Sequence, residues 1–157
     1  MSTTALIDLL APEAVCLNLE AKSAKEVIET LGGKLQASGY ARSTFIDAAW
    51  SREQVMPTGL PLAGEINAAI PHCDIEHVIK PAVALATLTE NVNFQNMIAP
   101  EESVPCRLVF LLALEQPKAQ VEMLQAIAGI LQDPQTVDQL VGADTLEKVR
   151  KILSEQA

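Results

Sequence analysis

Apolar residues recur along this chain at two spacings, and the spacing separates predicted helices from predicted strands. Repeats of three and four residues keep apolar side chains on one face of a helix, whereas short apolar runs bounded by turn residues are typical of strands. The helical spacing predicts helices over residues 24–35 and 121–131. Further helices are expected over 6–10, 44–54 and 134–142, where caps, prolines or glycines mark several of the ends, and a terminal helix opens at 144–147. The apolar runs predict strands over residues 15–19, 66–70, 83–88 and 107–114.

Capping and turn residues support these boundaries. Ser23 and Glu26 stand in the positions of a capping box, in which each side chain satisfies a backbone N–H of the first turn. Gly39 is a natural end for the helix that they open, and the pair Asp133-Pro134 is a cap followed by proline at the first helical position. The prolines and glycines within residues 56–65 predict a loop there.

The order of these elements predicts a single α/β domain over residues 1–157, with a central β-sheet flanked by helices. The runs over 83–88 and 107–114 are almost continuously apolar, as expected of strands that helices cover on both faces. Hydrophobic residues make up 49% of the chain and aromatic residues only 3%, so the core must consist of aliphatic side chains.

Charge and cysteine content narrow the function and the compartment. The net charge of −9 and the scattered basic residues predict no nucleic-acid partner, and they favour a protein partner with a basic face. The three cysteines are far apart in the sequence, which predicts reduced thiols. No signal peptide is visible, and the apolar run over 108–114 is far shorter than the roughly 20 residues of a membrane-spanning helix. We therefore expect a soluble, cytoplasmic protein.

The candidate chemistry concentrates in residues 52–77, which contain both histidines of the chain, His72 and His77. His72 follows Pro71 at the end of a predicted strand, where open α/β sheets place many of their sites. A neutral imidazole is a nucleophile at cell pH and can accept and release a phosphoryl group. Arg52 is the nearest candidate in the sequence for holding the charge of that group, because a guanidinium offers two donors to phosphate.

Taken alone, these residues leave other interpretations open. A single histidine after a proline is more often structural, and Arg52 and Glu53 are more often a solvated helix end. Ligand chemistry also allows a metal site, although the spacing matches no closed zinc pattern. Its ligands would be His72, Cys73, Asp74 and His77. With no evident basic neighbour to lower its pKa, Cys73 is expected to be a small buried residue.

The order of three motifs resembles the signature of the mannitol/fructose-type IIA family of the bacterial sugar phosphotransferase system. These motifs are Arg-Glu at 52–53, Pro-Thr-Gly-Leu at 57–60 and Ile-Pro-His at 70–72. The resemblance implies a mixed β-sheet flanked by helices, phosphorylation of His72, and stabilisation of the phosphoryl group by Arg52. Many members carry a second histidine where this chain has Gln120, which can donate a hydrogen bond but carries no charge. Gln120, the cysteine after His72, and His77 resemble the galactitol branch, and the resemblance implies supporting roles for Gln120 and His77.

The function that the resemblance implies is a phosphotransferase, an EIIA component that needs no metal or organic cofactor. His72 would accept a phosphoryl group from the carrier HPr and pass it to a soluble IIB subunit, which phosphorylates sugar entering through the membrane subunit IIC. Docking is expected on an apolar surface around His72, with Met56, Leu60 and Leu62 as candidates that could equally belong to the core. Two alternatives stay open: a regulatory IIA-like protein phosphorylated on His72 that controls a transporter or transcription factor, and a binding module that is not phosphorylated.

Overall fold

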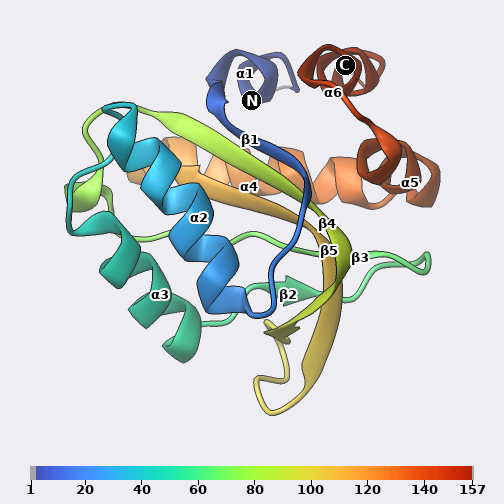
Figure 1. The fold of residues 1–157 in the computed structure, drawn as a ribbon, viewed down its shortest axis with the longest axis horizontal. Coiled ribbons are helices and arrows are strands. Elements are labelled where there is room, and N and C mark those ends of the chain that lie inside the picture. The colour runs from blue at the N-terminus through green and yellow to red at the C-terminus, as the bar shows by residue number, and fades with distance from the viewer. Residues whose placement is uncertain (1–2, 157) are drawn as a thin grey trace.

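The computed structural model describes residues 3–156 and arranges five strands in one mixed sheet with the order β1-β4-β5-β3-β2. β1 is parallel to β4 and β3 is parallel to β5, whereas the pairs β4–β5 and β2–β3 are antiparallel. The strands are β1 (Leu10–Leu19), β2 (Gly59–Leu60), β3 (Asn67–Ala69), β4 (Ala82–Gln95) and β5 (Ser103–Ala113). The helices are α1 (Thr3–Leu9), α2 (Ala24–Ala37), α3 (Phe45–Val55), α4 (Pro117–Leu131), α5 (Pro134–Gly142) and α6 (Leu146–Ser154), with a short 3-10 helix, η1 (Ile75–His77). A mixed sheet flanked by helices confirms the predicted fold class (Figure 1).

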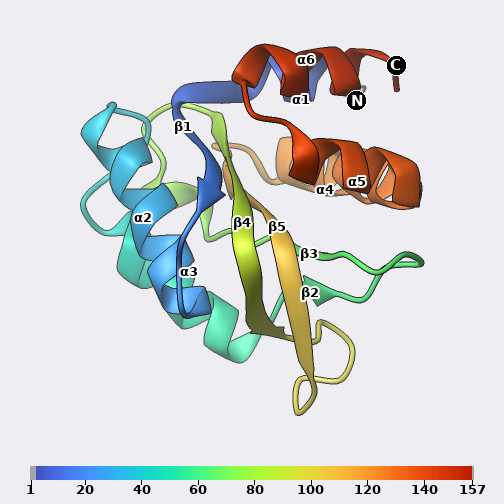
Figure 2. The ribbon, with the colours of Figure 1, turned by 45° about the vertical axis from the view of Figure 1, so that its right-hand side comes forward.

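Helices cover both faces of the sheet, and the alternation of side chains along the central strands divides the core in two. Ala84 and Ala86 face the core beneath α2 and α3, whereas Leu85 and Phe110 face the core beneath α1, α4, α5 and α6. Successive strand residues point to opposite faces, so an unbroken apolar run supplies both cores at once. Figure 2 shows the sheet between the two helical layers.

The predicted helices are present, and their caps follow the sequence in part. Ser23 Oγ accepts a hydrogen bond from Glu26 N at 3.1 Å, as the capping box requires. Glu26 Oε2, however, accepts from Lys22 N at 3.0 Å instead of from the capping residue itself. Near the N-terminus, α1 ends at Leu9 and β1 begins directly at Leu10, whereas the sequence predicted a helix over 6–10 and a strand only from residue 15.

The loop predicted over 56–65 was wrong in one part, because it contains β2, which pairs with β3. A Cβ on Gly59 would stand 2.5 Å from the carbonyl oxygen of Gln95, so a residue without a side chain is what lets β2 approach the end of β4. Met97 N donates a hydrogen bond to Gly59 O at 2.9 Å, which brings the turn between β4 and β5 beside β2. β4 continues to Gln95, beyond the predicted run 83–88, and from residue 91 onward exposed and buried residues alternate along it.

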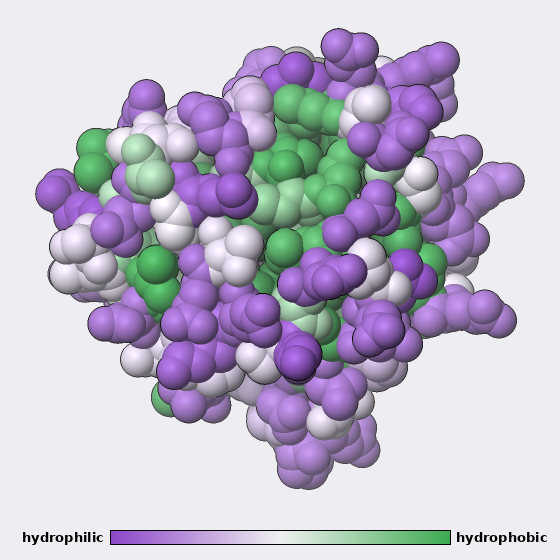
Figure 3. Space-filling view, in the orientation of Figure 1, coloured by the Kyte–Doolittle hydropathy of each residue, from purple (hydrophilic) through white to green (hydrophobic). Residues whose placement is uncertain are grey.

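β1 forms one edge of the sheet, and β2 forms the other. Val15 and Leu17 of β1 are only partly buried, and Figure 3 shows apolar surface gathered over this strand with polar side chains around it. Within residues 3–156, no helix has the length and apolar character needed to cross a bilayer.

Candidate functional site

His72 lies where the chain leaves β3 and continues toward η1. Leu112 N on β5 donates a hydrogen bond to Pro71 O at 3.0 Å, which ties this segment to the sheet. His72 is 9% exposed, so little of its ring reaches solvent. His72 Nδ1 is 3.0 Å from Ile70 O, and because a carbonyl oxygen only accepts, Nδ1 carries the proton. In the neutral ring, Nε2 therefore has the free lone pair that a nucleophile needs.

The surroundings of His72 keep its ring neutral. Burial lowers the pKa of His72 below its usual value, because the charged ring would lose its hydration. The positive charge of Arg52 lowers this pKa further, while the hydrogen bond to Ile70 and the charge of Asp74 act in the opposite direction. At neutral pH, His72 is thus an uncharged nucleophile with one fixed tautomer.

Arg52, near the end of α3, lies beside His72 although the two residues are far apart in the sequence. Both side chains line two depressions, one of about 310 Å³ and one of about 400 Å³. Arg52 Nη1 is 3.4 Å from Asp74 Oδ1, and Arg52 Nε is buried without a hydrogen-bond partner among the described residues. A buried N–H without an acceptor is unfavourable, so an oxygen atom that reached it would be bound favourably. The site therefore presents a cationic donor group beside a neutral nucleophile.

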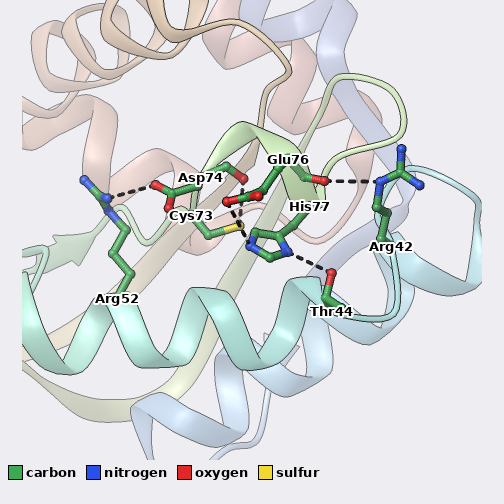
Figure 4. A network of polar contacts seen from close by, with 7 residues as sticks. All are labelled: Arg42, Thr44, Arg52, Cys73, Asp74, Glu76 and His77. Carbon is green, nitrogen blue, oxygen red and sulfur yellow. Dashed lines mark hydrogen bonds and ion pairs between the residues drawn. The ribbon is translucent and has the colours of Figure 1, made fainter.

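Gln120 and His77 lie in different surroundings. Gln120, on α4, lines the larger depression together with His72 and Arg52. His77 ends η1, and its Nδ1 is 2.8 Å from Thr44 Oγ1. Figure 4 shows this contact on the side of the polar network away from Arg52, and His77 lines neither depression. The structure thus brings together His72, Arg52 and Gln120, and it places His77 elsewhere.

The alternative of a metal site at residues 72–77 has no geometric support. Within residues 3–156, no three His, Cys, Asp or Glu side chains form a group that could hold a metal ion. Cys73 is buried, as expected, and burial raises the pKa of its thiol to about 12, so it stays protonated. The three cysteines are unpaired.

Exposed apolar side chains surround the two depressions. They are Val55, Met56 and Met97 at the smaller depression, and Ile75 and Val121 at the larger one. Met56, which is 55% exposed, thus lies on the surface around His72. Leu60 and Leu62 instead pack against the core beneath α4, α5 and α6, so of the two interpretations of these leucines the structural one holds.

Glu53 is a buried residue of the site, so the interpretation of this residue as part of a solvated helix end was wrong. Glu53 is 5% exposed, and its two carboxylate oxygens accept from Thr58 N at 2.8 Å and from Thr58 Oγ1 at 2.9 Å. Thr58 Oγ1 in turn accepts from Ile70 N at 3.2 Å, and Ile70 O is the acceptor that holds the ring of His72. Glu53 therefore anchors the backbone that orients His72. The sequence signal for this role was Thr58, which follows the end of α3 closely and can donate to a carboxylate through both its N–H and its hydroxyl.

We expect Glu53 to make the fold less stable as the pH rises. Burial raises the pKa of Glu53 from 4.5 to about 7, so between these values the folded state holds a proton that the unfolded chain releases. The contribution is fully present below pH 4.5 and is lost as the pH rises to about 7, at most about 1.4 kcal/mol per pH unit. Urea unfolding at about pH 5 and about pH 7.5 should show a larger loss of stability in the natural protein than in Glu53→Gln. Equal losses in the two proteins would contradict this assignment.

Comparison with known proteins places the chain in a family. Residues 8–156 match the family described as "Phosphoenolpyruvate-dependent sugar phosphotransferase system, EIIA 2". The galactitol-specific EIIA component of Escherichia coli (strain K12) is 34% identical over 116 residues, which cover 74% of this chain and 76% of that protein. Enzyme IIAMTL, solved in complex with phosphorylated enzyme IIBMTL from Escherichia coli, has a TM-score of 0.76 and 27% identity, covering 93% of this chain and 97% of its own. The nitrogen regulatory protein IIA-Ntr from Neisseria meningitidis has a TM-score of 0.77 and 26% identity, covering 95% of this chain and 99% of its own.

The chain belongs to the EIIA type 2 family of the phosphoenolpyruvate-dependent sugar phosphotransferase system. EIIA components of this system are phosphotransferases that carry a phosphohistidine intermediate. Family membership confirms the predicted family and enzyme class, with phosphoryl relay as the general function. A neutral histidine beside an arginine suits that chemistry, because the transfer depends mainly on positioning and on compensating negative charge.

Proposed function

We propose that this chain relays a phosphoryl group through Nε2 of His72, from phosphorylated HPr to a IIB subunit of a sugar transport system. One observation carries the proposal: the buried ring has Nδ1 fixed by Ile70 O and lines two depressions that Arg52 also lines. In this proposal residues 1–157 act as one EIIA domain in the cytoplasm, a compartment that the three unpaired cysteines fit.

The transfer has two steps that balance without an added base. First, Nε2 of His72 attacks phosphorus, so a P–N bond to His72 forms while the P–N bond to the histidine of HPr breaks. Second, a cysteine thiolate of IIB attacks phosphorus, so an S–P bond forms and the electron pair of the broken P–N bond returns to Nε2. Because Nδ1 keeps its proton throughout, no proton has to leave the buried ring. Arg52 compensates the charge of the transferring oxygens, and Gln120 offers an uncharged donor from α4.

The surface around His72 suits partner proteins that dock and leave. Five exposed apolar side chains ring the two depressions, while the chain as a whole carries a net charge of −9. An apolar centre within an acidic surface favours partners that present an apolar patch with basic residues around it. The solved complex of enzyme IIAMTL with phosphorylated enzyme IIBMTL supports a IIB subunit as one of these partners. HPr, as donor, would use the same surface, because both partners must reach Nε2.

Sugar uptake is favoured over a regulatory role. The galactitol-specific EIIA component shares 34% identity over 74% of this chain, and the likeness to IIA-Ntr, at 26% identity, is no greater than the likeness to enzyme IIAMTL, at 27%. Gln120, the position at which the sequence departs from the mannitol type, lines the depression of His72, so this departure lies at the site itself. We accordingly propose a galactitol-type uptake system, with the membrane subunit IIC acting through IIB.

The test is phosphorylation of the purified protein by phosphoenolpyruvate, enzyme I and HPr. Intact-mass measurement should show a gain of one phosphoryl group that is labile to acid and stable to base, as expected of phosphohistidine. Addition of a galactitol-type IIB subunit should then discharge the group. No mass gain would overturn the proposal in favour of a binding module, and a stable label that no sugar-specific IIB removes would favour regulation.

A further inference from the structure

Asp74 is a charged residue of the site that the relay does not use. It lies between His72 and η1 and lines the larger depression together with His72, Arg52 and Gln120. Its position is that of a helix cap, yet its side chain makes no capping hydrogen bond. Among residues 3–156, the only hydrogen bond or ion pair of its carboxylate is the one with Arg52, at 3.4 Å from Oδ1 to Nη1 (Figure 4).

The ion pair between Arg52 and Asp74 is weak enough for a phosphoryl group to displace Asp74. The side chains are 32% and 69% exposed, so water screens the attraction and the pair contributes little to stability. A phosphoryl group on His72 carries close to two negative charges and offers three acceptor oxygens, which makes it a stronger partner for a guanidinium than one exposed carboxylate. Arg52 also has the buried Nε that no described residue satisfies. The phosphoryl group therefore takes Arg52 from Asp74.

Displacement leaves the carboxylate of Asp74 without its partner and next to a second anion. Like charges that line one small depression repel, and at close range this repulsion persists although water weakens it. Arg52 and Asp74 line the same depression as the ring of His72, and their charges act on the pKa of His72 in opposite directions.

We propose that Asp74 is a positioning residue that competes with the phosphoryl group for Arg52 and thereby destabilises phosphorylated His72. This inference rests on the proposed relay. Its consequence is a phosphoryl group that is held loosely enough to pass onward to the acceptor cysteine. A relay needs that property, because a site that bound the group too tightly would accept it and fail to release it.

The experiment measures the equilibrium between phospho-HPr and this protein for Asp74→Asn, by intact mass at known HPr concentrations. The amide keeps an acceptor for Arg52 and removes the charge, so we expect the equilibrium constant to shift about three- to tenfold toward phosphorylated protein. Spontaneous hydrolysis and discharge to IIB should slow in the same variant. The urea midpoint should stay unchanged, which separates this role from a merely structural one.

Glu76→Gln is the matched control. Glu76 belongs to η1 and its side chain is 74% exposed. Its carboxylate lies 3.9 Å from His77 Nε2, and within residues 3–156 it forms no hydrogen bond or ion pair with Arg52. This variant removes the same charge from the same segment and should leave the equilibrium where it is. The inference is overturned if Asp74→Asn stays within twofold of the natural protein, or if Glu76→Gln shifts the equilibrium equally. If the natural protein itself takes no label, the relay fails rather than the role of Asp74.

Discussion

Replacement of His72 by alanine should abolish labelling by phospho-HPr. The variant lacks the nucleophilic Nε2, and no other imidazole in residues 3–156 lines the two depressions that Arg52 lines. The fold should survive with a loss of about 1–2 kcal/mol, because the ring makes a single hydrogen bond within residues 3–156, to Ile70 O. Intact-mass measurement reports the label, and circular dichroism with urea unfolding reports the fold.

His77→Ala is the matched control for that experiment. It removes the second imidazole, which contacts Thr44 and Glu76 and lies outside the depressions of His72. We expect this variant to accept and release the phosphoryl group at nearly the natural rate. A label that persists in His72→Ala and disappears in His77→Ala would show that the assignment names the wrong histidine.

Arg52→Ala should slow phosphoryl transfer about 100-fold in both directions. In the proposed relay the guanidinium of Arg52 stabilises charge on the transferring oxygens, and that charge is present whichever partner is the donor. The transfer rate of Arg52→Lys should lie between those of the natural protein and Arg52→Ala, because an ammonium keeps the charge but cannot present two donors in a fixed fork. Rapid-quench measurements with phospho-HPr, and with phospho-IIB in the reverse direction, give both rates.

Arg42→Ala controls for the loss of one positive charge. Arg42 Nε donates a hydrogen bond to Glu76 O at 3.2 Å, at the opposite end of the network in Figure 4. This variant should transfer phosphate at the natural rate. If Arg52→Ala were slow only with one partner, its guanidinium would serve docking of that partner instead of the transfer itself.

Local sequence determined most of the fold, because its signals act between neighbouring residues. Helical spacing and capping residues placed the six α-helices in order, and the apolar runs placed the central strands that carry both cores. The proline before His72 likewise predicted an imidazole at the end of a strand, which is where it lies. β2 was not predicted, because a two-residue strand has no hydrophobic pattern of its own and depends on its pairing with β3.

Only the tertiary structure decided which charged residues form the site. α3 places Arg52 at the depressions and buries Glu53, the next residue, against Thr58. The sequence shows only that the two residues are adjacent, and it does not show the direction in which each side chain points. The turn after His72 directs Asp74 toward Arg52 and His77 toward Thr44, although all these residues looked equally close to the chemistry in the sequence. Burial, tautomer and ion pairing depend on neighbours that the chain brings from distant segments. For that reason His72 could be proposed as the nucleophile from the sequence, while the buried contact of Glu53 and the ion pair of Asp74 could not be foreseen.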